Sequence, residues 1–228
     1  MNIAIVGATG NVGRKTLEVL EKKGLTLGNL YLVASSKSAG KKIHFQGKDI
    51  VVSELENFDF SKVKIAFFAA GGKISEKFAE KAAKHCLVID NSSFFRMDPD
   101  VPLIVPQVNS DALNNIKKNI IANPNCSTAQ LVIALKPLHD LFVIKRIVVS
   151  TYQSVSGAGK ASMDELIKQT KLALDGKDIK SENFTKPIAF NAIPHIDVFS
   201  EDGYTKEELK MRNETKKILD DKIHLTAT

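Results

Sequence analysis

Short apolar runs alternate with segments of helical spacing along the first half of the chain. Helical spacing, with apolar residues three or four positions apart, is found in Gly13–Lys23 and Ser75–Lys84. Around these segments lie short apolar runs of strand length. The predicted strands are Asn2–Val6, Leu30–Ala34, Lys64–Ala69, Leu87–Asp90, Leu103–Val108 and Asn119–Ala122. This alternation predicts a doubly wound, mostly parallel α/β sheet with helices on both faces.

The pattern changes near residue 124. We predict a helix at Cys126–Leu135 that Pro137 ends, because proline disrupts a helix interior. The remaining predicted elements are a strand at Lys145–Ser154, a helix at Ala161–Leu174, an extended segment at Pro187–Pro194 and an amphipathic helix at Thr205–Leu219. We therefore predict two domains, residues 1–124 and residues 125–228, the second of mixed α+β type.

A glycine-rich turn directly follows the first predicted strand. The stretch Gly7-Ala8-Thr9-Gly10-Asn11-Val12-Gly13 opens the first helix, and its glycines allow a tight turn and a close backbone approach to a pyrophosphate. The N–H groups at the start of that helix attract anions. We interpret residues 1–124 as a Rossmann-type dinucleotide-binding domain. The alternative is a glycine turn that serves only the packing of the helix on the sheet.

The end of the second predicted strand indicates which dinucleotide binds. Enzymes that use NAD usually place an acidic residue there to hold the ribose 2′-OH. Residues 34–40 contain no acid and offer hydroxyl groups and Lys37, which suit a 2′-phosphate. We predict NADP as the cofactor, and a solvated polar loop is the alternative. A further glycine turn, Ala69-Ala70-Gly71-Gly72, is expected to face the same crevice.

The stretch Asn123-Pro124-Asn125-Cys126 is the strongest indication of chemistry. Proline and asparagine favour a turn, after which Cys126 begins a predicted helix. The positive end of the helix dipole favours the thiolate, which is the nucleophile needed to attack an aldehyde or an acyl phosphate. Cys86 lies beside the apolar run Leu87–Ile89, and we interpret it as a packing residue.

Composition narrows the class of protein. The net charge is +6, but the basic residues are dispersed, aromatic residues are few and Trp is absent, which argues against a nucleic-acid groove. No apolar run approaches the ~18 residues of a membrane span. Met1 leads straight into a strand pattern, so we expect no signal peptide. Two widely separated cysteines fit a reducing cytoplasm.

Several motifs together resemble one enzyme family, the aspartate-semialdehyde dehydrogenases, in order and over essentially the whole chain. The matching stretches are Gly7–Gly13, Ser35–Gly40, Asp90–Arg96, Val105–Asn109, Asn123–Thr128, Ser150–Gly159, Pro187–Val198, Glu207–Lys210 and Glu214-Thr215. The resemblance implies the Rossmann-type domain already predicted, followed by part of an α+β catalytic and dimerisation domain.

The resemblance also implies roles for individual residues. Cys126 matches the nucleophile that forms a thioester, and Gln153 matches the residue that positions the substrate. Arg96 and Lys210 match groups that hold phosphate. Glu207 matches an acid near the substrate's amino group, with adjacent Glu208 as the alternative. The residues that match cofactor contacts are Thr9, Gly10, Asn11, Val12, Ser35, Ser36, Ser156 and Gly157.

Each of these residues also has an interpretation without a role in binding or catalysis. These interpretations are a surface arginine at Arg96, a polar strand end at Gln153, a solvated helix face at Glu207–Lys210 and a simple helix-entry loop at Ser156–Gly159.

The activity implied by the resemblance is the NADPH-dependent conversion of L-aspartyl 4-phosphate into L-aspartate 4-semialdehyde and phosphate. The product feeds the synthesis of lysine and diaminopimelate, threonine and methionine, and the family forms homodimers or homotetramers. Two alternatives stay open: an NADP-binding module without catalysis, and a related reductase that acts on N-acetyl-glutamyl phosphate.

The sequence departs from the family at its end. The family's substrate-binding arginine and its general acid/base histidine both follow the segment that matches Ile223–Thr228, and this sequence ends at Thr228. We expect none of the histidines present to replace that base, because none lies beside the nucleophile motif. They are His44, His85, His139, His195 and His224.

Overall fold

The computed structural model describes residues 1–228, which form two compact units. Unit 1 contains Met1–Lys145 and Asn213–Ile223, and unit 2 contains Arg146–Arg212 and His224–Thr228. The units thus divide after Lys145, whereas the domain boundary that we predict from the sequence lies between residues 124 and 125.

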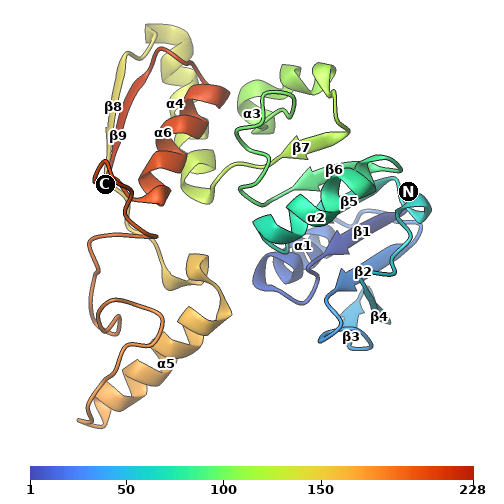
Figure 1. Ribbon diagram of the computed structural model, residues 1–228, viewed down its shortest axis with the longest axis horizontal. Coiled ribbons are helices and arrows are strands. Elements are labelled where there is room, and N and C mark those ends of the chain that lie inside the picture. The colour runs from blue at the N-terminus through green and yellow to red at the C-terminus, as the bar shows by residue number, and fades with distance from the viewer. The chain divides into compact units, whose positions relative to one another are not determined.

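Unit 1 is built on a seven-stranded sheet (Figure 1) with the strand order β3-β4-β2-β1-β5-β6-β7. The strands are β1 (Ile3–Val6), β2 (Leu30–Ala34), β3 (Lys42–Phe45), β4 (Lys48–Glu54), β5 (Ile65–Phe68), β6 (Leu87–Asp90) and β7 (Ile120–Ala122). All neighbours pair in parallel except β3 with β4. The predicted doubly wound α/β sheet is confirmed.

Helices cover both faces of this sheet. Along β1, Ala4 and Val6 belong to one apolar cluster, and Ile3 and Ile5 belong to the other, as the two-residue repeat of a strand requires. Helix α2 (Gly72–Ala83) contributes Phe78 and its neighbours to the first cluster, and α1 (Asn11–Lys22) contributes Leu17 and Leu20 to the second. A strand buried on both faces reads as a continuous apolar run, which is why β1 was recognisable from the sequence.

The elements predicted from the sequence do not include the β3–β4 hairpin of unit 1. Its turn, Gln46-Gly47, has positive φ at both residues, 46° and 77°, which matches the twist of a two-residue hairpin. The available signal was the alternation of Ile43 and Phe45 with polar residues just before a glycine.

Two further predictions for unit 1 were wrong. The predicted strand Leu103–Val108 makes only an isolated bridge from Leu103 to Ala122, and its second half is the short helix α3 (Pro106–Asn109). Pro106 occupies the first turn of α3, where no N–H is needed. Helix α4 (Cys126–Phe142) does not end before Pro137 but runs through it to Val143, whose φ is 54°. The 3-10 helices η1 (Phe60–Lys62) and η2 (Ser110–Asn115) complete the unit.

Unit 2 contains a two-stranded parallel sheet of β8 (Arg146–Val149) and β9 (His224–Ala227). It also contains the 3-10 helix η3 (Val155–Ala158), α5 (Lys160–Leu174) and the first part of α6 (Lys206–Ile218), whose residues from Asn213 onward belong to unit 1. The predicted helices are confirmed. Strand β8 is shorter than the predicted Lys145–Ser154, and the predicted extended segment Pro187–Pro194 contains a turn at residues 189–190.

A buried polar pair on α5 holds the irregular segment that follows this helix. Glu165 accepts hydrogen bonds from the N–H groups of Glu182 and Asn183, and the Gln169 side-chain oxygen accepts those of Ile188 and Ala189. The chain therefore folds back along α5 (Figure 1) without a sheet to satisfy the hydrogen bonds of its backbone.

None of the helices in the structure combines the length and the apolar character needed to cross a membrane.

Candidate active site

The loops that carry the predicted chemistry in unit 1 leave the sheet at one edge. Because β1, β5, β6 and β7 are parallel, their carboxyl ends meet along that edge. The loops after them contain the two glycine turns, the Asn91–Arg96 stretch and the Asn123–Cys126 stretch. Successive crossovers place β2 on one side of β1 and β5 on the other, so the strand order reverses there. Ligands of doubly wound sheets bind at such a reversal.

The glycine turn after β1 is closed by backbone contacts. Gly7 has a φ of 86°, and a Cβ at this position would lie 2.6 Å from the carbonyl oxygen of Ala69. A Cβ at Gly13 would lie 2.3 Å from the Gly7 oxygen, so α1 starts directly against the turn. Gly10 and Asn11 are exposed at the start of α1, with Val12 after them. The turn fits a pyrophosphate, because no side chain caps the N–H groups at the start of α1.

The loop after β2 lies against this turn. The hydroxyl of Thr9 donates to the hydroxyl of Ser38 at 3.4 Å, and the N–H of Ser38 donates to the Ser35 oxygen at 2.8 Å. Ser35, Ser36 and Lys37 are exposed. A loop with hydroxyl groups, one ammonium group and no carboxylate fits the 2′-phosphate of NADP.

Cys126 is the first residue of α4, and its side chain is exposed. The preceding residue, Asn125, is the N-cap, and its side-chain oxygen accepts the N–H groups of Ser127 at 2.9 Å and Thr128 at 3.4 Å. The sulfur thus lies at a capped helix N-terminus, four residues beyond the end of β7, on the edge of the sheet that carries the glycine turn.

The other cysteine lies in a different environment. Cys86 is 5% exposed, and its thiol donates to the Ala82 carbonyl oxygen at 3.4 Å. Burial raises the pKa of this thiol to about 11. The interpretation of Cys86 as a packing residue is confirmed.

Arg96 is a buried arginine that ties together the ends of two strands. It is 8% exposed and donates from Nε to the Asn123 oxygen at 2.9 Å, from Nη2 to the Asn91 oxygen at 3.2 Å, and from Nη1 to Glu214 at 3.0 Å. The guanidinium has five N–H groups, so at most two remain for a phosphate. The alternative of a surface arginine is excluded.

The remaining predicted residues belong to unit 2. The side-chain nitrogen of Gln153 is shielded from solvent and makes no hydrogen bond within the protein. Ser156 and Gly157 are exposed in η3, and the Ser156 hydroxyl lies 2.6 Å from that of Ser154. Within this segment, the side-chain nitrogen of Gln153 is therefore a polar group that the fold itself does not use.

Lys210 lies between two carboxylates. Its Nζ donates to Asp197 at 2.9 Å and to Glu207 at 3.1 Å. Burial alone would lower the pKa of Lys210, but these two partners outweigh burial and raise the pKa above its ordinary value. The ammonium is therefore charged at neutral pH, as a phosphate-binding group must be.

The two adjacent glutamates make different contacts in the structure. Glu208 and Thr205 form a capping box: the Glu208 carboxylate accepts the Thr205 N–H at 2.7 Å, and the Thr205 hydroxyl accepts the Glu208 N–H at 3.3 Å. Glu207 instead contacts Lys210. These contacts favour Glu207 as the substrate-binding acid. The T-x-x-E spacing of Thr205 and Glu208 is the sequence signal of this capping box.

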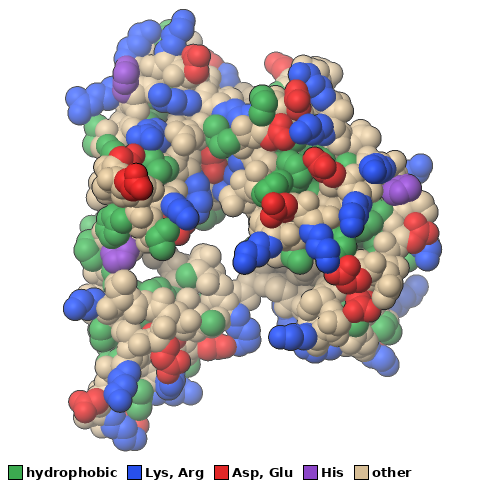
Figure 2. All heavy atoms as spheres, in the orientation of Figure 1, with side chains coloured by type: hydrophobic (Ala, Val, Ile, Leu, Met, Phe, Trp, Pro, Cys, Tyr) green, Lys and Arg blue, Asp and Glu red, His purple; other side chains and the backbone are tan.

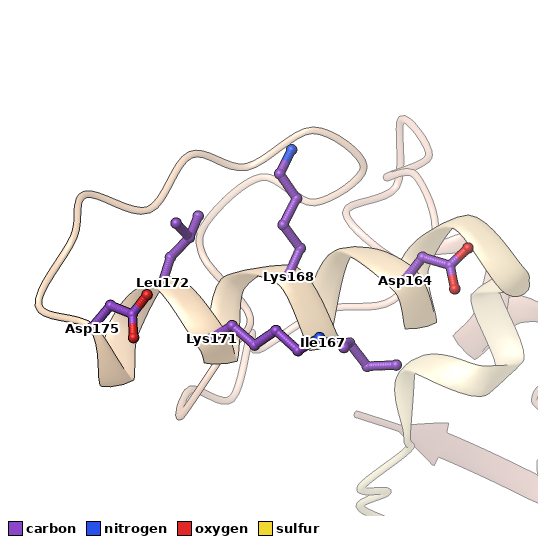
Figure 3. Close-up of a pocket in the computed structure, with 6 residues that line it drawn as sticks. All are labelled: Asp164, Ile167, Lys168, Lys171, Leu172 and Asp175. Carbon is purple, nitrogen blue, oxygen red and sulfur yellow. The ribbon is translucent and has the colours of Figure 1, made fainter.

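A surface depression along α5 contains none of the predicted residues. It is lined by Asp164, Ile167, Lys168, Lys171, Leu172 and Asp175, whose side chains fan out from a single helix (Figure 3). Charges of both signs are interspersed on the face drawn in Figure 2, as the dispersed lysines of the sequence suggested. The depression contains none of the predicted catalytic residues, and the dispersed charges form no single patch, so the candidate active site stays at the strand-end edge of unit 1.

Two family models match the chain. Residues 2–116 match the semialdehyde dehydrogenase NAD-binding domain, and residues 135–228 match the semialdehyde dehydrogenase dimerisation domain. The aspartate-semialdehyde dehydrogenase of Aquifex aeolicus is 54% identical over 99% of this chain and 68% of its own length. This chain belongs to the aspartate-semialdehyde dehydrogenase family.

Solved members of this family share the fold. Aspartate-semialdehyde dehydrogenase II from Vibrio cholerae, solved in complex with ASA, aligns with a TM-score of 0.97 at 51% identity, over 100% of this chain and 68% of that protein. The enzyme from Candida albicans, solved with NADP, aligns with a TM-score of 0.68 at 27% identity, over 99% of this chain and 66% of that one. The chain thus spans about two thirds of the length of these aspartate-semialdehyde dehydrogenases.

The family membership confirms three predictions from the sequence: the resemblance, the Rossmann-type fold and the oxidoreductase class with NADP as cofactor. The roles of individual site residues stay predictions.

Proposed function

We propose that this protein catalyses the NADPH-dependent reductive dephosphorylation of L-aspartyl 4-phosphate to L-aspartate 4-semialdehyde through a thioester on Cys126. The observation that carries the proposal is the exposed Cys126 thiol at the capped start of α4, on the edge of the sheet that carries the glycine turn. A thiol placed there is open to a substrate, and a cysteine sulfur is the nucleophile that a thioester mechanism requires.

The thiolate attacks the carbonyl carbon of the acyl phosphate. A C–S bond forms, the bond from that carbon to the phosphate oxygen breaks, and inorganic phosphate leaves. Bound NADPH supplies the hydride that reduces the thioester. Breaking the C–S bond then releases the aldehyde and restores the thiolate. The covalent step divides one difficult displacement into two easier ones.

Charged residues of each unit have the chemistry to hold the substrate. In unit 1, Arg96 keeps up to two N–H groups for a phosphate oxygen. In unit 2, Lys210 offers an ammonium group and Glu207 a carboxylate for the substrate's amino group. The unbonded amide of Gln153 suits the polar reacting group.

We further propose that the protein works as a homo-oligomer in the cytoplasm. The match of residues 135–228 to a dimerisation domain supports the first point. Two free cysteines, one of them the nucleophile, support a reducing compartment.

The test is NADPH oxidation with aspartyl phosphate, together with intact-mass detection of the acyl adduct. Cys126→Ser is expected to lose the adduct and at least ~10²-fold in rate, because a hydroxyl is a far weaker nucleophile at neutral pH. Cys86→Ser is the matched control and should keep both. Equal rates for wild type and Cys126→Ser would refute the thioester mechanism. Tight NADPH binding with neither adduct nor turnover would favour the binding-module alternative.

A further inference from the structure

Glu214 is a buried carboxylate that the proposed reaction does not use. It is 2% exposed, and both of its oxygens are engaged by residues that lie far away in the sequence. One oxygen accepts Arg96 Nη1 at 3.0 Å, and the other accepts the backbone N–H of Asn125 at 2.6 Å. A single side chain from the last part of α6 therefore contacts two of the loops at the strand-end edge.

The contact with Asn125 fixes the turn that precedes the proposed nucleophile. Asn125 is the N-cap of α4, and its own side chain already binds the N–H groups of Ser127 and Thr128. Glu214 holds the backbone of the same residue from the other side. The first turn of α4, with Cys126 as its first residue, is thus anchored at its cap by both a side chain and a backbone contact.

The contact with Arg96 balances a buried charge close to the same turn. Arg96 donates to the Asn123 oxygen, three residues before Cys126, and its side chain is 9% exposed. An unpaired cation at such a place would be costly, because it has little water to solvate it. The carboxylate of Glu214 compensates that charge and accepts a hydrogen bond from one of the guanidinium N–H groups.

The same helix makes a second attachment to this region. One turn after Glu214, the Lys217 ammonium donates to the carbonyl oxygens of Arg96 and Asp98 at 2.7 Å and of Val101 at 2.9 Å. Lys217 thus anchors the backbone at Arg96, whereas Glu214 contacts the guanidinium. The backbone attachment does not depend on Glu214, so the fold of this loop has an anchor that a change at Glu214 leaves in place.

We propose that Glu214 is a positioning residue for Cys126, which fixes the cap of α4 and offsets the charge of Arg96 beside it. The proposal rests on the proposed function only in taking Cys126 as the nucleophile. A glutamine at this position has one acceptor oxygen, so it satisfies either Arg96 or the Asn125 N–H and turns its amide group toward the other donor. It also leaves Arg96 without a counter-charge, which favours the Cys126 thiolate.

The test is the pH profile of Cys126 alkylation by iodoacetamide, which needs neither substrate nor turnover. Glu214→Gln is expected to lower the midpoint of this profile by about half a pH unit or more. At a pH below both midpoints, this change corresponds to alkylation that is roughly threefold faster than in wild type. The control, Glu76→Gln, removes one negative charge from the exposed face of α2 and should leave the midpoint in place. Buried Cys86 reports whether each variant is folded.

An unchanged midpoint in folded Glu214→Gln overturns the proposal, because a merely structural tie would not alter the charge near the thiol. Should this variant not fold, Arg96→Gln combined with Glu214→Gln removes both charges, a change that proteins tolerate better than the loss of one partner. The midpoint of that double variant is expected within about 0.3 pH units of wild type, and a larger displacement overturns the proposal. Failure of NADPH oxidation in wild type would refute the proposed function but not change this readout.

Discussion

Gly7 and Ala69 approach so closely that a Cβ at residue 7 would stand 2.6 Å from the Ala69 carbonyl oxygen. The two residues follow β1 and β5, the strands between which the strand order reverses. The backbone of one turn therefore packs on the backbone of the other, which leaves no room for a side chain at residue 7.

Gly7→Ala is expected to destabilise the protein by about 2–5 kcal/mol, because it adds both a strained positive φ and a backbone overlap. Gly10→Ala is the matched variant, since its Cβ would meet only the Gly7 oxygen at an ordinary 3.4 Å. It should cost less than about 1 kcal/mol yet weaken NADPH binding, because a pyrophosphate needs a close backbone approach at this turn. Urea unfolding and NADPH titration measure the two effects. Equal stabilities of the two variants would contradict this account of the turn.

Lys37 is expected to set the preference for NADPH over NADH. Lys37→Glu places a carboxylate where we predict the 2′-phosphate, so NADPH should bind at least tenfold more weakly while NADH binding changes little. Lys48→Glu makes the same charge change at an exposed position of β4 and serves as the control. Fluorescence titration with both dinucleotides at one ionic strength gives the ratio. A parallel loss in both variants would mean that Lys37 acts only through net charge.

Glu165 is expected to make the segment after α5 sensitive to acid. Burial alone would raise the pKa of Glu165, but hydrogen bonds from Glu182 and Asn183 outweigh burial and lower it. Because the folded pKa lies below that of an unfolded glutamate, the stabilisation is fully present above about pH 4.5 and is lost as the pH falls through the folded value.

Amide exchange over residues 180–189 checks this prediction. Wild type should be protected at pH 7 and lose protection in acid, beyond the change in intrinsic exchange rate. Glu165→Gln should lose about 1–3 kcal/mol of local stability already at pH 7, because a neutral amide replaces a charged acceptor. Asp178→Asn removes an exposed carboxylate just before this segment and should match wild type. Full protection of Glu165→Gln at pH 7 would contradict the prediction.

Much of the fold followed from periodicity. Buried parallel strands appear as continuous apolar runs, and α1, α2, α5 and α6 repeat apolar residues at helical spacing, so both kinds of element were recognised locally. The errors lay where local signals conflict with packing. Pro137 predicts a helix end in the sequence, yet α4 continues through this residue. The β3–β4 hairpin depends on positive φ angles at Gln46 and Gly47, which the pattern of apolar residues does not predict.

The sequence by itself determined the glycine turn, the hydroxyl-rich loop and a cysteine at a helix start, because each is a local arrangement of neighbouring residues. Only the tertiary structure decided that Arg96 is buried, that Glu208 caps α6 while Glu207 contacts Lys210, and that Glu214 joins Arg96 to the cap of Cys126's helix. Glu214 lies 118 residues from Arg96 and 89 from Asn125. Contacts across such separations depend on how strands and helices pack, which side-chain spacing along the chain does not encode.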